Sequence, residues 1–175
     1  MNYETIIEME LALSRHFNRR ANLIVPNISW GLNLHECDLL ILSKAGFATE
    51  VEIKTSKADL KKDKEKQHGH YSEKIRRLYF AVPEKISEEF ALEHIPERAG
   101  LIVVNKKGYC FEKKKCAVNT KARAFSDEER FKMARLGALR IWNLKLKLFK
   151  YSKDRKELLS IIKELKKENS LYVKH

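Results

Sequence analysis

The sequence predicts an α/β fold in which helices flank a mixed central sheet, with a helical extension at the C-terminal end. Strand-length segments lie between residues 37 and 111, helical periodicity occurs before and among them, and residues 126–175 carry helical patterns alone. The 175 residues are 43% hydrophobic, enough to build a core without disulfides or structural metals. We expect a core over residues 1–125 and an extension over residues 126–175 that packs on the same domain.

The first half of the chain predicts two helices on either side of a β-hairpin. Apolar residues recur at helical spacing near the start, a turn-rich stretch covers residues 26–31, and Lys44-Ala45-Gly46 can join two strands. Thr55-Ser56 can then cap a strongly charged helix. The expected elements are a helix at 3–20, strands at 37–43 and 47–55, and a helix at 57–68.

The second half predicts the remaining strands and the helical tail. A turn at Lys106-Lys107-Gly108 can lead a last strand back along the sheet, which should then have four or five strands. Ser126 and Glu129 are three residues apart and form a capping box that opens the tail. The expected elements are a strand at 77–82, a short helix at 84–95, strands at 100–104 and 109–111, and helices at 126–149 and 153–167.

The charge of the chain points to a polyanionic partner. It has 36 Lys and Arg against 24 Asp and Glu, a net charge of +12. Residues 106–150 alone hold 14 Lys or Arg and 4 Asp or Glu, a net +10, which could form a track for a phosphate backbone. The alternatives are a solvated helix face on a merely basic protein, or contact with an anionic membrane surface.

Several other classes of protein are disfavoured. The first residues lack the pattern of a signal peptide and no apolar run is long enough to span a bilayer, so we expect a cytoplasmic protein. Cys37, Cys110 and Cys116 are odd in number and lack C-x-x-C spacing, which predicts reduced thiols rather than disulfides or a zinc site. No phosphate-binding loop of the G-x-x-x-x-G-K type is present.

One predicted strand carries the residues best suited to chemistry. Its two-residue period places Glu50, Glu52 and Lys54 on one face, and Asp38 on the other arm of the hairpin can approach that face. Neighbouring carboxylates repel unless a cation neutralises them, and oxygen ligands of this kind suit Mg²⁺ or Mn²⁺. The alternative is an exposed edge strand whose Glu and Lys side chains pair in solvent.

The spacing of these residues resembles the signature of the PD-(D/E)XK nuclease superfamily. Asp38 is followed after thirteen residues by Glu52-Ile53-Lys54, across a strand, a turn and a strand. The resemblance implies a restriction-endonuclease-like core, with Asp38, Glu52 and the carbonyl of Ile53 as metal ligands and Lys54 as the catalytic lysine. Glu36-Cys37-Asp38 departs from the Pro-Asp pair of the signature.

Within that superfamily the chain is similar to the MmcB-like group of presumed DNA-repair proteins. The resemblance covers residues 1–105, and the tail after Ser126 has no counterpart in it. The residues that carry it are Glu50-Val-Glu-Ile-Lys-Thr-Ser-Lys-Ala-Asp59, Asp63, Lys66 and Tyr79-Phe-Ala-Val-Pro83.

Two more positions are candidates for the same site. Glu10 lies on the apolar face of the first helix, and similar nucleases take an acidic metal ligand from this helix. Glu4 or Glu8 would substitute if the helix were rotated, and the alternative for Glu10 is a glutamate that reaches solvent. Gln67 and Tyr71 resemble a Q-x-x-x-Y motif, which implies a catalytic role for Gln67, although Gly69 weakens the helix between them.

The expected function is therefore a Mg²⁺- or Mn²⁺-dependent nuclease acting on DNA, with RNA left open as a substrate. The alternatives are a non-catalytic nucleic-acid-binding module that keeps the same fold, and a protein-interaction domain with a basic surface. The residues expected to contact nucleic acid are Lys57, Lys66, His68, Lys113, Lys114, Lys115 and Arg130.

Overall fold

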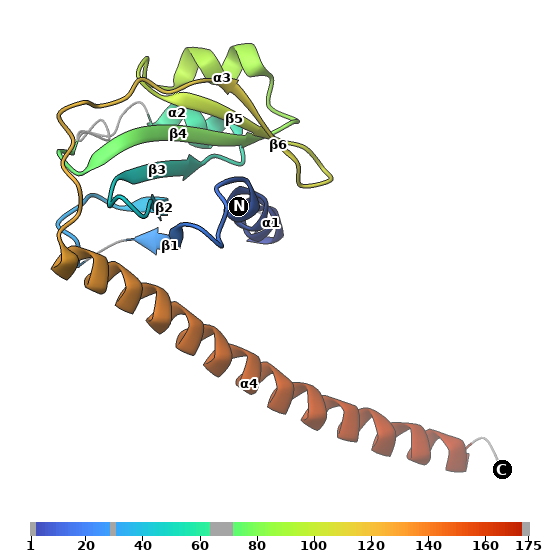
Figure 1. Ribbon diagram of the computed structural model, residues 1–175. Coiled ribbons are helices and arrows are strands. Elements are labelled where there is room, and N and C mark those ends of the chain that lie inside the picture. The colour runs from blue at the N-terminus through green and yellow to red at the C-terminus, as the bar shows by residue number, and fades with distance from the viewer. Residues whose placement is uncertain (1–2, 29–30, 64–71, 173–175) are drawn as a thin grey trace. The chain divides into compact units, whose positions relative to one another are not determined.

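The computed structural model describes residues 3–28, 31–63 and 72–172 (Figure 1). By its internal contacts the chain forms two units, Met1–Gly137 and Ala138–His175, and the whole sheet belongs to the first. The elements are α1 (Tyr3–His16), β1 (Leu23–Ile28), β2 (Cys37–Leu42), β3 (Ala48–Ile53), α2 (Lys57–Asp63), β4 (Ile75–Pro83), α3 (Glu88–His94), β5 (Gly100–Val104), β6 (Cys110–Lys114) and α4 (Asp127–Tyr172).

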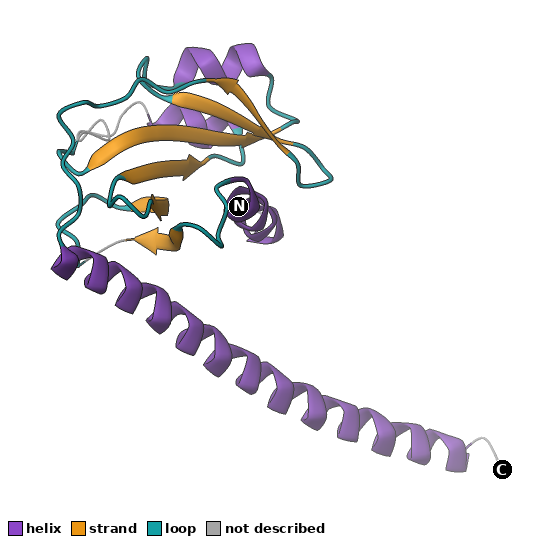
Figure 2. Ribbon diagram, viewed as in Figure 1, coloured by secondary structure: helices purple, strands orange, loops and turns teal. Residues whose placement is uncertain are grey.

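The six strands form one sheet, and it is mixed, as the sequence predicted. They lie in chain order from β1 to β6 (Figure 2). The pairs β3–β4 and β4–β5 are parallel, with α2 and α3 in the connections, whereas the other neighbouring pairs are antiparallel. This α/β architecture is consistent with a restriction-endonuclease-like core.

The sequence prediction missed strand β1, because Pro26 and Asn27 were interpreted as part of a turn. Pro26 instead pairs with Leu39 of β2, and Asn27 has a φ of 53°. Proline is tolerated here because β1 is an edge strand, where one side of the backbone makes no ladder bonds. The sheet consequently has six strands rather than the expected four or five.

Apolar side chains cover both faces of the sheet. On one face, Met9, Ala12 and Leu13 of α1 pack against the middle strands. On the other face, residues of α2 and α3 pack on β4 and β5, including Leu60 and Ala91. The β1–β2 end of that second face is covered by Phe125 and by Met133 and Leu136 in the first turns of α4. Strand β3 lies between these last two clusters.

Helix α4 begins as predicted but continues further than predicted. Ser126 and Glu129 form the capping box, with the Ser126 N–H donating to Glu129 Oε2 at 2.9 Å and the Glu129 N–H donating to Ser126 Oγ at 3.3 Å. The prediction of two helices separated near Ser152 is wrong, because residues 150–153 include no glycine or proline to end the helix. No helix among the described residues is both long and apolar enough to cross a membrane.

Candidate active site

The predicted catalytic strand lies inside the sheet rather than at its edge. β3 is flanked by β2 and β4, and its six residues are all buried. Glu50, Glu52 and Lys54 keep only 0%, 2% and 5% of their surface exposed. The alternative of a solvated edge strand is therefore wrong. Three ionisable groups in the interior are costly unless they are paired, so their partners define the site.

Lys54 is held between two buried carboxylates. Its Nζ lies 2.8 Å from Glu52 Oε2 and 2.7 Å from Asp63 Oδ1. Asp63 is the last residue of α2, and it follows Leu60, which packs into the core, by three residues on the same side of the helix. Burial lowers the pKa of Lys54, but Glu52 and Asp63 outweigh this and raise it above the ordinary value. Lys54 is therefore a cation at neutral pH.

Asp38 approaches the same end of β3 from β2. Leu40 pairs with Glu50 and Leu39 with Val51, so the next position in this register sets Asp38 opposite Glu52. Directly opposed residues of an antiparallel pair share a face of the sheet. The Ile53 N–H also donates to Asp38 Oδ2 at 2.8 Å. Asp38, Glu52, Ile53 and Lys54 thus gather at one place, as the sequence predicted.

A second buried pair adjoins this group. His35 Nε2 lies 2.8 Å from Oε1 of the fully buried Glu50. The pKa of the Cys37 thiol is raised first by burial and then by the negative charges of Glu50, Glu52 and Asp38. Cys37 is free, as predicted, and its raised pKa makes it a poor nucleophile.

Glu10 of α1 is half-buried and has a partner in the edge strand β1. Asn27 of β1 donates from Nδ2 to Glu10 Oε1 at 3.3 Å. Burial raises the pKa of Glu10, and the bond from Asn27 partly lowers it. Asn27 falls between the β1–β2 pairs formed by Pro26 and Ile28. Asn27 therefore links Glu10 to β1, the strand that pairs with β2 next to Asp38.

The donors at this site suit a hard divalent cation, but in this arrangement they are engaged with one another. Carboxylate oxygens are the ligands that Mg²⁺ and Mn²⁺ prefer, and Asp38 and Glu52 supply them beside the Ile53 backbone. Across the part of the chain that the structure describes, no three His, Cys, Asp or Glu side chains converge as a ready metal cage. Binding an ion with Glu52 would therefore compete with Lys54 for this carboxylate.

A family model for DNA repair protein MmcB-like matches residues 32–147, about two thirds of the chain, and this range includes the whole cluster from His35 to Asp63. The chain belongs to the MmcB-like family. No curated protein matches it.

Two solved structures are similar to this MmcB-like protein. The SPO1766 protein of unknown function from Silicibacter pomeroyi has a TM-score of 0.58 at 18% identity, over 85% of this chain and 93% of the other. SfsA from Pyrococcus furiosus, solved in complex with Ca²⁺, has a TM-score of 0.29 at 14% identity, over 65% of this chain and 64% of the other. The first likeness supports the fold, and the second is too distant to support an argument.

Most of the predicted nucleic-acid contacts in this MmcB-like protein have intramolecular partners. Lys113 Nζ lies 3.2 Å from Glu88 Oε2, and Lys114 Nζ donates to the Glu97 carbonyl at 2.6 Å. Lys57 Nζ lies 4.7 Å from the ring centroid of Phe90, and Lys115 is exposed. The predicted residues Lys66, Gln67, His68 and Tyr71 lie outside the described residues.

Arg130 has a structural position in the MmcB-like fold that its place on a charged helix did not predict. Its Nε donates to the Phe125 carbonyl at 3.1 Å, and its guanidinium lies against Gly46 in the β2–β3 turn. Gly46 has a φ of 85°, and a Cβ there would collide with the guanidinium. The predicted hairpin turn at residues 44–46 is confirmed, and Arg130 packs on it.

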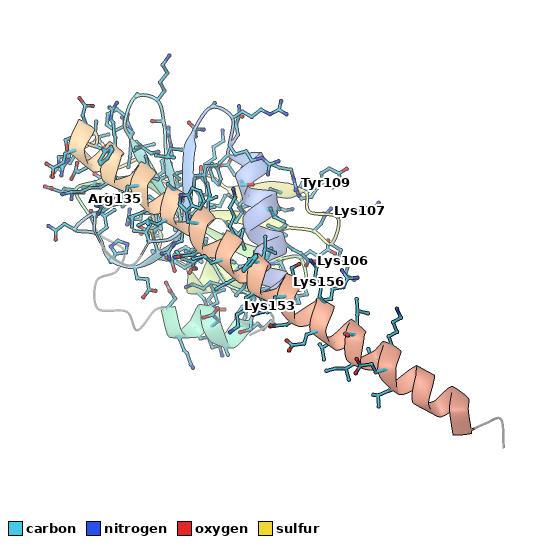
Figure 3. All side chains as sticks on the ribbon, turned by 90° about the horizontal axis from the view of Figure 1, so that it is seen from below. Lys106, Lys107, Tyr109, Arg135, Lys153 and Lys156 are labelled. Carbon is cyan, nitrogen blue, oxygen red and sulfur yellow. The ribbon has the colours of Figure 1, made fainter. Side chains whose placement is uncertain are left out.

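Sequence reasoning missed several residues of this MmcB-like protein that the structure makes prominent. His35 and Asp63 complete the buried pairs. His35 was not singled out from the sequence, and Asp63 was named only among the residues that carry the family resemblance, without a role at the site. Tyr109 and Phe111 are 63% and 50% exposed. Tyr109 projects beside Lys106 and Lys107 at the β5–β6 turn (Figure 3), so aromatic and basic groups are mixed next to the edge strand β6.

Proposed function

We propose that this protein is a Mg²⁺- or Mn²⁺-dependent phosphodiesterase that cleaves DNA during repair. One observation carries the proposal: Asp38, Glu52 and Lys54 meet in the interior of the sheet, at the D…E-x-K spacing typical of PD-(D/E)XK nucleases. The match to a DNA-repair family adds the substrate class. The net charge of +12 supports a polyanionic substrate.

In the proposed mechanism Asp38 and Glu52 would hold the cation, and the Ile53 carbonyl would be a third donor. When bound, the cation would polarise the scissile phosphate and lower the pKa of the attacking water. Lys54, whose pKa is raised by Glu52 and Asp63 in this structure, would supply a positive charge beside the phosphate. That charge stabilises the negative charge that develops on the phosphate in the transition state.

Asp63 positions Lys54 in this mechanism. Its carboxylate lies 2.7 Å from Lys54 Nζ and is anchored through α2, whose Leu60 is fully buried. If Glu52 turned from Lys54 to hold the ion, Asp63 would still compensate the charge of the lysine. Lys54 can therefore lose Glu52 as a partner while its buried ammonium group stays paired with Asp63.

The test is a cleavage assay on labelled single-stranded, duplex and branched DNA, with Mg²⁺, with Mn²⁺ and with EDTA. We expect cleavage that requires the metal and that falls about 10²-fold or more in Lys54→Ala, the scale of one transition-state charge contact. Asp38→Asn should lose metal affinity, in part rescued by higher Mn²⁺, because it removes an anionic ligand. The control is Asp127→Asn, the same substitution at an exposed carboxylate of α4.

A second candidate function is a non-catalytic DNA-binding module. The observation that favours it is the closed set of ion pairs, in which Glu52 is occupied by Lys54 and no metal cage is formed among the described residues. This candidate predicts metal-independent DNA binding with no cleavage of any substrate. It also predicts that Asp38→Asn and Lys54→Ala leave DNA affinity unchanged.

A further inference from the structure

The second unit of the chain exposes far more apolar surface than a solvated helix needs. Side chains of α4 are described as far as residue 165, and its large apolar residues between 139 and 165 are exposed. The match to the MmcB-like family model ends at residue 147, so most of this surface lies beyond the matched range. Extended apolar surfaces of this kind mark interaction sites.

Seven of these exposed residues follow a heptad repeat. Positions seven apart from Ile141 are Leu148, Arg155 and Ile162, and positions seven apart from Leu144 are Tyr151, Leu158 and Leu165. Seven of these eight side chains are apolar or aromatic, and those seven are between 46% and 67% exposed. Apolar residues at the first and fourth positions over four heptads are the pattern of a coiled coil, which is stable only when a partner helix covers the seam.

We propose that a second copy of this chain covers the seam, with the two α4 helices antiparallel over residues 141–165. Centred on residue 153, this pairing sets Ile141 against Leu165, Leu144 against Ile162 and Leu148 against Leu158 of the second copy. The three layers on either side of the centre therefore contain only aliphatic side chains. The one polar residue of the seam, Arg155, meets Tyr151 of the second copy at the centre, where a guanidinium can stack on an aromatic ring.

The flanking charges favour the same orientation. Residues 138–165 hold 8 Lys or Arg and 3 Asp or Glu, so two copies associate only if the pairing keeps their cations apart. In the antiparallel arrangement Lys145 flanks Leu159 and Lys147 flanks Ile161 of the second copy, and each lysine stem can lie along an aliphatic side chain. The two Asp154 carboxylates also meet near the centre, and the adjacent Arg155 guanidinium groups offset their repulsion.

A parallel pair lacks these advantages. It would set Arg155 directly against Arg155 in the seam and Arg140 beside Lys145 of the second copy, two repulsive contacts between like charges. Lys153 and Lys156, labelled on α4 in Figure 3, lie at outer heptad positions in either orientation. They stay in solvent, where a dimer could offer them to nucleic acid.

The mass of the full-length protein in solution, measured by sedimentation over a range of concentrations, tests the association. We expect a concentration-dependent dimer in the wild type and in Leu146→Glu, which changes an outer residue that is 67% exposed. Leu148→Glu changes a seam residue that is 58% exposed, and we expect it to weaken the dimer about a hundredfold or more. A wild type that stays monomeric, or equal effects of the two changes, would overturn the proposal.

The orientation is tested by a spin-label distance. With Cys110→Ser and Cys116→Ser as background, Asn143→Cys places a label on the outer side of α4, ten residues from the centre of the pair. At 1.5 Å per residue, antiparallel helices separate the two labels by about 30 Å along the axis, whereas parallel helices set them level with each other. Level labels would overturn the antiparallel arrangement. Neither measurement depends on cleavage, so failure of the nuclease assay leaves this proposal standing.

Discussion

The charged side chains of strands β3 and β6 differ in how far they are buried. The Lys54–Glu52 pair of β3 is 6% and 2% exposed at its side chains, whereas the Lys113–Glu88 pair on β6 and α3 is 42% and 38% exposed. Removing two charges from water costs several kcal/mol per ion, which their attraction repays only with good geometry, while a surface pair costs little and contributes little. The buried pair is therefore the one that needs a reason beyond stability, and the proposed catalytic role would supply one.

The largest effect expected from this comparison is on stability. Lys54→Met removes the cation between Glu52 and Asp63, leaves two buried carboxylates together, and should cost about 3–5 kcal/mol of unfolding free energy. Lys113→Met makes the same change at the exposed pair and should cost less than about 1 kcal/mol. Urea denaturation of both variants at neutral pH measures the difference. Equal losses would show that burial does not distinguish the two strands.

A second effect concerns a partly buried network at the start of α4. Hydrogen bonds from Arg123, the Ser126 N–H and Lys74 outweigh burial and hold the pKa of Glu129 well below its ordinary value of 4.5. Because the folded pKa is lower than the unfolded one, this stabilisation is present above pH 4.5 and is lost as the pH falls through the folded value.

Glu129→Gln should therefore lose about 1.5–3 kcal/mol at pH 7, the typical contribution of hydrogen bonds to a charged group. Its stability should converge with that of the wild type as the pH falls below 4.5. Denaturation at several pH values checks this, with Glu128→Gln as the control, since that carboxylate is 75% exposed. A constant difference between Glu129→Gln and wild type at all pH values would contradict the ionic explanation.

A smaller effect is expected at the exposed aromatic residues of β6 and its turn. Tyr109→Ala and Phe111→Ala should each weaken binding of single-stranded DNA about tenfold, because bases stack on exposed aromatic rings with about 1–3 kcal/mol each. Duplex binding should change less, since its bases are already stacked. Fluorescence anisotropy measures both, and Phe131→Ala is the control because Phe131 is 70% exposed but lies on α4. Equal losses on both DNA forms would remove the stacking explanation.

The smallest effect is expected for a single exposed lysine. Lys115→Glu, directly after β6, should lower the slope of log affinity against log salt by about one, the contribution of one phosphate contact. Lys44→Glu in the β2–β3 turn makes the same change of charge at another exposed site. If both variants shift the slope equally, the basic residues act through net charge rather than through a track along β6.

Much of the fold followed from local patterns in the sequence. The capping box of Ser126 and Glu129, the turn at Gly46 and the buried strand β5 were each predicted, because caps, turns and apolar runs depend on neighbouring residues. Strand β1 was missed because its Pro26 is acceptable only at the edge of a sheet. Which strand forms the edge depends on the pairing of the whole sheet, and no local pattern contains this information.

For the candidate site, the sequence by itself determined which residues of β3 share a face, because the two-residue period is a property of any strand. From this period the sequence predicted that Glu50, Glu52 and Lys54 lie on one face of the strand. Only the tertiary structure decided that Asp63 takes the second place at Lys54 and that Asp38 accepts the Ile53 N–H. These contacts depend on how α2 docks and on the register of β2 with β3, and both are set by the packing of distant residues rather than by the sequence near the site.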